Sequence, residues 1–220
     1  MFIKRGKKED LEKFAVDRIA KEIEIFLISH ETITMGLAGG TSVEGLYKLF
    51  GKKDLDWENI HIFLVDERCV PLESKDSNSQ IIKKYFSKKL PKKNLHFYDY
   101  IKYSPDNYAF RLRKFGNKFD LIVLSAGEDG HIASLFPNHE SIKSRKVGYI
   151  EVNNAPKPPN ERISATRKLI EKSSISFLLF LGKEKMKAFE NFIDENVSIE
   201  QCPAKIVKKI SKSFVLTDNK

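Results

Sequence analysis

Runs of consecutive apolar residues recur along the chain, and stretches with helical spacing separate them. The apolar runs lie within residues 32–37, 59–65, 119–124 and 174–181, whereas residues 8–27 place apolar side chains three and four positions apart, with charges between them. A strand that is apolar along its whole length is buried on both faces, which is typical of a parallel sheet. The pattern therefore predicts an α/β fold, with a mostly parallel, Rossmann-like sheet and helices on both faces.

Turn and capping signals place the remaining elements around these strands. Pro105 lies early in one helical stretch, where helix starts favour proline. Polar residues that can cap a helix precede two other stretches: Thr41-Ser42 in one case, and Asp76, Ser77 or Asn78 in the other. The further predicted strands are 95–100, 147–153 and 213–218, the further predicted helices are 76–86, 104–115 and 183–193, and residues 153–164 are predicted as a surface loop.

The length and composition fit one domain. With 220 residues the chain can bury a sizeable core, and 41% hydrophobic with 31% charged residues is an ordinary globular balance. No linker or internal repeat divides the chain, so residues 1–220 are expected to form a single domain. The two cysteines, Cys69 and Cys202, lie far apart and outside any metal-binding spacing, which argues against a disulfide framework and a structural zinc site.

Charge and hydropathy limit the partners and the compartment. The net charge is +9, but the lysines are scattered in pairs, which favours a solvated lysine-rich surface over a nucleic-acid-binding arm. No run approaches the roughly 18 apolar residues of a membrane span, and the first residues are too charged for a signal peptide. We therefore expect a cytoplasmic protein that binds neither nucleic acid nor membrane. Its positive charge suits an anionic small molecule.

Three of the predicted strands end in glycine-rich or charged sequence. The segments are LAGGTS, LVDERCVP and LSAGEDGHIASLFP. In open α/β sheets, ligands bind beyond the carboxyl ends of the strands. If these strands are near neighbours, their ends converge on one cleft, and this edge is the predicted functional site.

The first of these segments, Gly39-Gly40-Thr41, is suited to binding an anion. Glycines let the backbone approach a ligand closely, and the following helix N-terminus offers free N–H groups. No lysine follows the glycines, so the segment is not a Walker A loop. From these residues alone, a plain turn between a strand and a helix is an equal alternative.

Charged side chains provide a second set of candidates. Asp66 and Arg68 end an apolar strand, where the arginine can bind phosphate or carboxylate and Asp66 can orient it or a substrate hydroxyl. The alternative is a local ion pair at the edge of the sheet. Arg162, Lys183 and Lys185 lie near other predicted junctions and are ordinarily surface charges. A cluster of them beside the glycine turn would instead indicate a phosphorylated substrate.

His131 is the candidate general base, since imidazole titrates near neutral pH. Asp129 lies two positions earlier and can hold the ring in one tautomer if the loop brings the two side chains together. The alternative is a structural histidine bonded to a loop carbonyl. The other histidines show no metal-ligand spacing, so no metal site is predicted.

Taken together, these segments resemble the 6-phosphogluconolactonase family. The match runs in order, from about residue 34 to 207, through GLAGGTSVEGLY, FLVDERCVPLESKDSNSQ, GEDGHIASLFP, PPNERIS, LFLGKEKMKA and CPAKIV. Glucosamine-6-phosphate deaminases of the same superfamily share the glycine turn and a DGH segment. Their DEY and GHIAFNEP differ, however, from the DER and GHIASLFP of this chain. The resemblance therefore favours the lactonases.

The resemblance implies hydrolysis of 6-phospho-D-glucono-1,5-lactone, a phosphorylated sugar lactone, to 6-phosphogluconate in the oxidative pentose phosphate pathway. It implies no cofactor, and we expect a monomer. His131 resembles the family's general base, and Asp129 and Asp66 resemble supporting acids. The groups that resemble the family's substrate-binding residues are Gly39, Gly40, Thr41, Arg68, Arg162 and Lys185, with Lys183 as the alternative to Lys185.

The chain departs from the family pattern at Ser125-Ala126, Asn138-His139 and Cys69. None of these departures removes a candidate catalytic group, so they bear on substrate affinity rather than on reaction type. Three alternatives to hydrolysis stay open. They are a deaminase acting on glucosamine 6-phosphate, a sugar-phosphate sensor without turnover, and a basic protein that binds nucleic acid.

Overall fold

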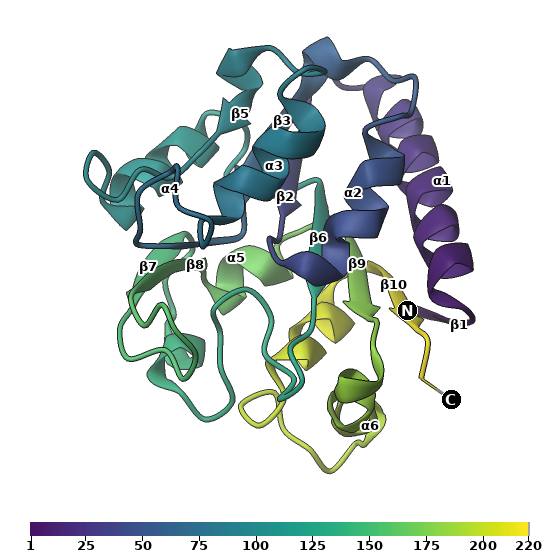
Figure 1. Ribbon diagram of the computed structural model, residues 1–220, viewed down its shortest axis with the longest axis vertical. Coiled ribbons are helices and arrows are strands. Elements are labelled where there is room, and N and C mark those ends of the chain that lie inside the picture. Colours follow the sequence, from purple (N-terminus) through teal and green to yellow (C-terminus); the bar gives the residue numbers. More distant parts are fainter. Residues whose placement is uncertain (220) are drawn as a thin grey trace.

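A parallel sheet of seven strands forms the centre of the computed structural model, which describes residues 1–219 (Figure 1). The strand order is β1-β10-β9-β6-β2-β3-β5, and each neighbouring pair in this order is parallel. The strands are β1 (Phe2–Arg5), β2 (Ile33–Leu37), β3 (Ile60–Leu64), β5 (Leu95–His96), β6 (Leu121–Ser125), β9 (Ile175–Phe180) and β10 (Lys212–Thr217). The predicted α/β fold is confirmed.

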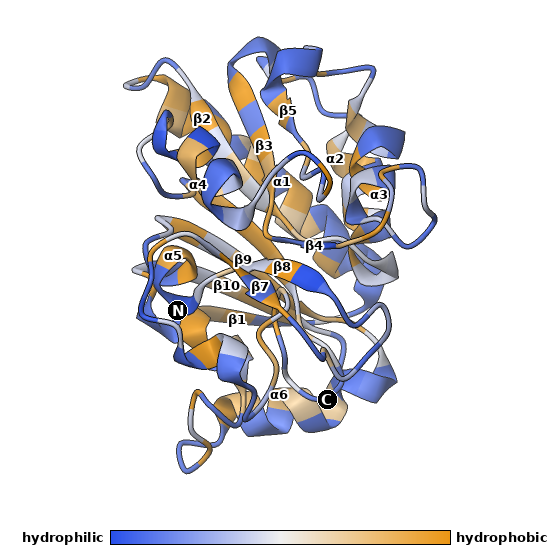
Figure 2. Ribbon diagram, turned by 90° about the vertical axis from the view of Figure 1, so that its left-hand side faces the viewer, coloured by the Kyte–Doolittle hydropathy of each residue, from blue (hydrophilic) through white to orange (hydrophobic). Residues whose placement is uncertain are grey.

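Helices cover both faces of this sheet, as the sequence predicts. One face packs against α1 (Lys8–Leu27), α2 (Glu44–Phe50) and α3 (Asn78–Phe86), and the other against α4 (Pro105–Arg113), α5 (Arg167–Glu171) and α6 (Met186–Ile193). Alternate side chains of β6 show this division. Leu121 and Val123 pack in the core under α1, α2 and α3, whereas Ile122 and Leu124 pack in the core under α4, α5 and α6. Figure 2 shows the resulting hydrophobic strands between helices with hydrophilic outer faces.

A small antiparallel sheet lies beside the central one and corrects two predictions. Its order is β4 (Asp66–Arg68), β8 (Arg162–Ala165) and β7 (Tyr149–Val152). The predicted single strand 59–68 is therefore two strands in different sheets, and the segment predicted as a loop contains β8. The backbone N–H of Ala165 donates to the carbonyl of Val65 at 2.7 Å, which joins the small sheet to the end of β3.

Smaller differences concern strand lengths and caps. The strand predicted at 95–100 is limited to β5, and β1 was not predicted, since its residues are mostly exposed at the edge of the sheet. Ser77 caps α3 by accepting a hydrogen bond from the backbone N–H of Ser79. The predicted cap at Thr41-Ser42 is wrong: the turn Thr41–Val43 starts after Gly40 with no side-chain cap.

The described residues 1–219 contain two cysteines, Cys69 and Cys202, and five histidines. Cys69 and Cys202 are both free thiols. In this range no group of three or more His, Cys, Asp or Glu side chains is arranged to hold a metal ion. No helix in the same range is both long enough and apolar enough to cross a membrane.

Candidate active site

A cavity of about 270 Å³ lies beyond the carboxyl ends of β2, β6 and β9, next to β4 and β8. All three strand ends predicted to converge contribute to its wall. The predicted residues that line it are Gly39, Gly40, Thr41, Asp66, Arg68, His131, Arg162 and Lys185. Asp129 is not in the wall but contacts His131, and Lys183 is exposed outside the cavity.

The glycine turn lies directly against the start of α3. An added Cβ on Gly39 would come within 2.0 Å of Asn78 Oδ1, so a side chain at this position would displace Asn78. Asn78 Nδ2 donates to the backbone oxygen of Asp66 at 2.9 Å. One buried side chain therefore connects the turn after β2 to the charged strand β4.

Glu67 fixes β4 to the N-terminus of α3. The residue is only 1% exposed, and both carboxylate oxygens are used as acceptors. At 2.7–2.9 Å they accept from the backbone N–H groups of Arg68, Asn78 and Ser79 and from the hydroxyls of Ser77 and Ser79. Burial raises the pKa of Glu67, and the hydrogen bonds from Asn78, Ser79 and Arg68 oppose this shift. Acceptance from all five donors at once requires the ionised carboxylate. Glu67 therefore holds its neighbours Asp66 and Arg68 in a fixed place at the cavity wall.

Two arginines are cross-strand neighbours in the small sheet. β4 and β8 pair so that Arg68 lies directly opposite Arg162, and both line the cavity. Burial lowers the pKa of Arg162; Asp66 opposes this shift and Arg68 adds to it. Like charges placed opposite each other destabilise an antiparallel pair. The arrangement is therefore suited to an anionic ligand that lies against both guanidinium groups.

The two candidate lysines before α6 differ in their surroundings. Lys185 is 5% exposed and its Nζ donates to Ser42 Oγ at 2.8 Å and to Ser125 Oγ at 2.9 Å. Burial lowers the pKa of Lys185 to about 8. Lys183 lies on the same turn but points outside the cavity. Lys185 is therefore the lysine available to a bound ligand.

His131 is held by the acid that the sequence places two positions earlier. Its Nδ1 lies 2.5 Å from Asp129 Oδ1. Burial raises the pKa of Asp129, but the hydrogen bonds from His131 and the charges of His131 and Lys157 together outweigh it, so the pKa is lowered. An ionised Asp129 can only accept, so in the neutral imidazole Nδ1 carries the proton and Nε2 has the lone pair. The ring lines the cavity, and its hydrogen bond to Asp129 is made through Nδ1.

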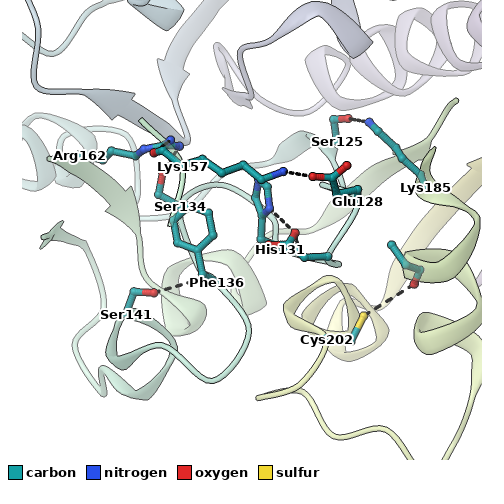
Figure 3. Close-up of polar contacts among 12 residues, drawn as sticks. Ser125, Glu128, His131, Ser134, Phe136, Ser141, Lys157, Arg162, Lys185 and Cys202 are labelled. Carbon is teal, nitrogen blue, oxygen red and sulfur yellow. Dashed lines mark hydrogen bonds and ion pairs between the residues drawn. The ribbon is translucent and has the colours of Figure 1, made fainter. Parts of the chain in front are cut away.

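The surroundings of His131 keep the ring in this position. An added Cβ on Gly127 would come within 2.1 Å of the imidazole, so this glycine makes room for the ring. The buried Phe136 ring lies 4.8 Å from the imidazole and 5.4 Å from the guanidinium carbon of Arg162. Figure 3 shows His131 between Arg162 on the left and Lys185 on the right, all three lining the same cavity.

An ion pair lies at the exposed side of the cavity. Lys157 Nζ is 2.5 Å from Glu128 Oε1, and both residues line the cavity (Figure 3). The backbone oxygen of Lys157 accepts from Arg162 at 2.6 Å, so this proline-rich loop is attached to the small sheet. The pair therefore connects two loops of the site at its surface.

Several polar lining residues are not among the predicted site residues. They are Ser42, Asn78, Ser125, Glu128, Lys157 and Glu184. Most of them lie within the segments that carry the family resemblance, but polar residues of this kind are ordinary in surface loops. Only Asn78 gives a signal of its own, because it follows a helix-capping serine and shares a segment with Asp66 and Arg68.

Comparison with known proteins identifies the family. The family model described as glucosamine-6-phosphate isomerases/6-phosphogluconolactonase matches residues 6–216. The chain belongs to this family. The resemblance that the motifs indicated is therefore confirmed.

Two relatives show where in the glucosamine-6-phosphate isomerase/6-phosphogluconolactonase family the chain lies. A 6-phosphogluconolactonase of Borreliella burgdorferi is 37% identical over 222 residues, which span 96% of this chain and 94% of that protein. The crystal structure of a 6-phosphogluconolactonase from Thermotoga maritima has a TM-score of 0.86 at 27% identity and covers 100% of this chain and 98% of that one.

A third protein of similar structure is named for a different activity. The structure of a monomeric glucosamine-6-phosphate deaminase has a TM-score of 0.84 at 22% identity, covering 99% of this chain and 97% of that one. At that identity the likeness shows the fold alone. Because the fold is common to both activities, the side chains in the cavity have to decide between them.

Proposed function

We propose that this chain hydrolyses 6-phospho-D-glucono-1,5-lactone to 6-phosphogluconate. The observation that carries the proposal is the pair of His131 and Asp129, with a ring nitrogen free to accept a proton, in a cavity that also holds two arginines and a lysine. The lactonase names of the relatives support the same reaction. The substrate and product are both anions, which fits the net charge of +9.

In the proposed reaction, His131 Nε2 takes a proton from a water molecule that attacks the lactone carbonyl carbon. The C1–O5 bond then breaks, and the imidazolium returns the proton to the ring oxygen. Asp129 stabilises the charged ring through its hydrogen bond to Nδ1. General-base catalysis of this kind contributes about 10²–10⁴-fold to a rate. No step of the proposal uses a metal or an organic cofactor.

The phosphate of the substrate supplies the orientation. In the proposal it is held by Lys185, the glycine turn Gly39-Gly40-Thr41 and Arg162, which line the same cavity as His131. Holding the phosphate fixes the lactone carbonyl against the base, and this proximity lowers the barrier. Arg68 is then available to stabilise the oxyanion that forms when water attacks.

The reaction type is tested by assaying the wild-type protein. The lactone is generated in situ with glucose-6-phosphate dehydrogenase, and the formation of 6-phosphogluconate is followed against the uncatalysed background. We expect acceleration, and we expect no ammonia when glucosamine 6-phosphate is the substrate. Release of ammonia without lactone hydrolysis would assign the protein to the deaminases. Binding of 6-phosphogluconate without turnover of the lactone would indicate a sensor.

A further inference from the structure

Ser125 is the last residue of β6, and its hydroxyl lies in the cavity wall. Its Oγ accepts a hydrogen bond from Lys185 Nζ at 2.9 Å (Figure 3), and Ser42 Oγ accepts a second one at 2.8 Å. Ser42 directly follows the glycine turn after β2, and Ser125 ends β6. The two hydroxyls therefore reach the ammonium from different segments of the chain. An ammonium has three N–H donors, which leaves one for a ligand in the cavity.

The charged form of Lys185 is only weakly supported by its surroundings. Glu184 on the same turn and Asp218 after β10 favour the charge, whereas Lys8 at the start of α1 and Lys157 in the loop before β8 oppose it. Burial outweighs these contributions and lowers the pKa of Lys185 to about 8. Within residues 1–219 the hydrogen-bond acceptors of Nζ are the two serine hydroxyls.

We propose that Ser125 and Ser42 are positioning residues that hold the Lys185 ammonium with its third N–H directed at the phosphate of the substrate. The inference rests on the proposed function and adds two residues to it. One of them, Ser125, is part of the Ser125-Ala126 pair at which the sequence differs from the family pattern. If Lys185 loses a proton, its two remaining N–H groups can stay on the serines, and a lone pair then faces the anion. The serines thus couple phosphate binding to the protonation of one lysine.

Removal of one hydroxyl destabilises the charged form of Lys185 and takes away one of the two hydrogen bonds that hold its side chain in place. For Ser125→Ala we expect the Kd of 6-phosphogluconate to rise about tenfold at neutral pH, which is the size of one hydrogen bond to a charged group. In lactone hydrolysis, KM rises and kcat stays close to that of the wild type. In addition, the pH above which affinity for 6-phosphogluconate falls is expected to be lower than in the wild type.

The test is calorimetric titration with 6-phosphogluconate from pH 6 to 9.5. It compares the wild type with Ser125→Ala, with Ser125→Thr, which keeps the hydroxyl, and with Ser174→Ala as a matched control. Ser174 Oγ also accepts a hydrogen bond from a lysine, Lys118 Nζ, at 3.2 Å. Ser174 precedes β9, however, whereas Lys185 and the cavity lie beyond the other end of this strand. We expect Ser125→Thr to regain most of the affinity and Ser174→Ala to match the wild type throughout.

The inference is overturned if Ser125→Ala binds 6-phosphogluconate with wild-type affinity and the same pH dependence. It is also overturned if Ser174→Ala shows the same loss. If Ser125→Ala does not fold, Ser42→Ala carries the same expectation from the other loop. A wild-type protein that binds 6-phosphogluconate but does not hydrolyse the lactone contradicts the proposed function alone, because the titration reports on Lys185 without turnover.

Discussion

At His131, one short hydrogen bond determines which ring nitrogen can accept a proton. Asp129 Oδ1 lies 2.5 Å from Nδ1 and also accepts from the backbone N–H of His131 at 3.1 Å. The two bonds close a small ring within the loop, so the carboxylate cannot turn away without breaking both. Sequence spacing alone could not establish this contact, because it depends on the loop conformation, which Gly127 permits by leaving space for the imidazole.

The substitution Asp129→Asn tests this contact at the residue scale. The amide of asparagine is uncharged and can turn its N–H₂ toward Nδ1, which would move the ring proton to Nε2 and remove the base. We expect kcat to fall on the order of 10²-fold, with a smaller change in KM. Asp106→Asn, which alters an exposed ion pair with Lys146, serves as the control and should leave both constants unchanged. Equal activity of Asp129→Asn and the wild type would show that the contact is only structural.

The candidate residues differ in how far the sequence could identify them. His131 and Arg68 are candidates because of their residue type and their position at predicted strand ends, whereas Arg162 is singled out by the family resemblance. The choice between Lys183 and Lys185 stayed open, since both lie in one turn of three residues. The two lysines differ in burial, which depends on how that turn packs against Ser42 and Ser125 from distant parts of the chain.

At the scale of elements, the N-terminus of α3 is the element that organises the small sheet. The helix starts at Asn78, after the capping residue Ser77, and its first N–H groups donate to the buried carboxylate of Glu67. The favourable interaction of a helix N-terminus with a carboxylate adds to these hydrogen bonds. As a result, Asp66 and Arg68 on either side of Glu67 are held at the cavity.

Replacement of this carboxylate by an amide tests its role in stability. In Glu67→Gln the amide N–H₂ faces donors, so at least one buried polar group loses its partner. We expect the free energy of unfolding to fall by about 2–3 kcal/mol and kcat/KM to fall with it. Glu24→Gln on the exposed side of α1 is the matched control. Chemical denaturation measures the change, and a Glu67→Gln variant as stable as the wild type would refute this account of α3.

Strands of the central sheet were predictable because both of their faces are buried. The apolar residues of β6 and β9, for example, serve two cores, so their sequences are continuously hydrophobic. The short strands β4 and β8 were not predicted as separate elements. They carry charged side chains into a cavity, and their pairing depends on contact between segments about a hundred residues apart. Local sequence therefore contains little information about them.

At the scale of the whole molecule, the edge strand β5 brings a histidine into the interior. His96 is 6% exposed, and its ring stacks on Phe63 with centroids 4.0 Å apart. Its two nitrogens lie 3.1 Å from His61 Nδ1 and 3.3 Å from an Arg111 nitrogen. Burial lowers the pKa of His96 to about 3, and the charge of Arg111 adds to the shift.

This shift makes the stability of the whole fold depend on pH. The unfolded chain protonates its histidine near pH 6.5, whereas the folded chain does so only near pH 3, so the unfolded state binds more protons between these values. The free energy of unfolding therefore falls as the pH is lowered below 6.5, by up to about 1.4 kcal/mol for each pH unit from His96. We expect the fall between pH 6.5 and 4.5 to be less steep in His96→Gln.

Denaturation at a series of pH values measures these slopes. His30→Gln, at the exposed end of α1, is the control and should keep the slope of the wild type. The difference between the two variants isolates His96 from the carboxylates, which also titrate in this range. Identical slopes in His96→Gln and His30→Gln would show that His96 takes up its proton as readily in the folded state as in the unfolded state.

The arrangement of two sheets explains why one cavity can hold both a histidine and several cations. The central sheet contributes Lys185 and the glycine turn at its carboxyl edge, and the small sheet contributes Arg68 and Arg162. The loop after β6 brings His131 between them. A ligand that spans the cavity would therefore contact residues from both sheets.

The most direct test of the account compares wild-type and His131→Ala protein in the hydrolysis of 6-phosphogluconolactone, with folding of the variant verified by circular dichroism. We predict that kcat falls by about 10²–10⁴-fold while KM changes little, because the groups proposed to bind the phosphate are intact. A folded His131→Ala variant that hydrolyses the lactone at the wild-type rate would contradict the assignment of His131 as the general base.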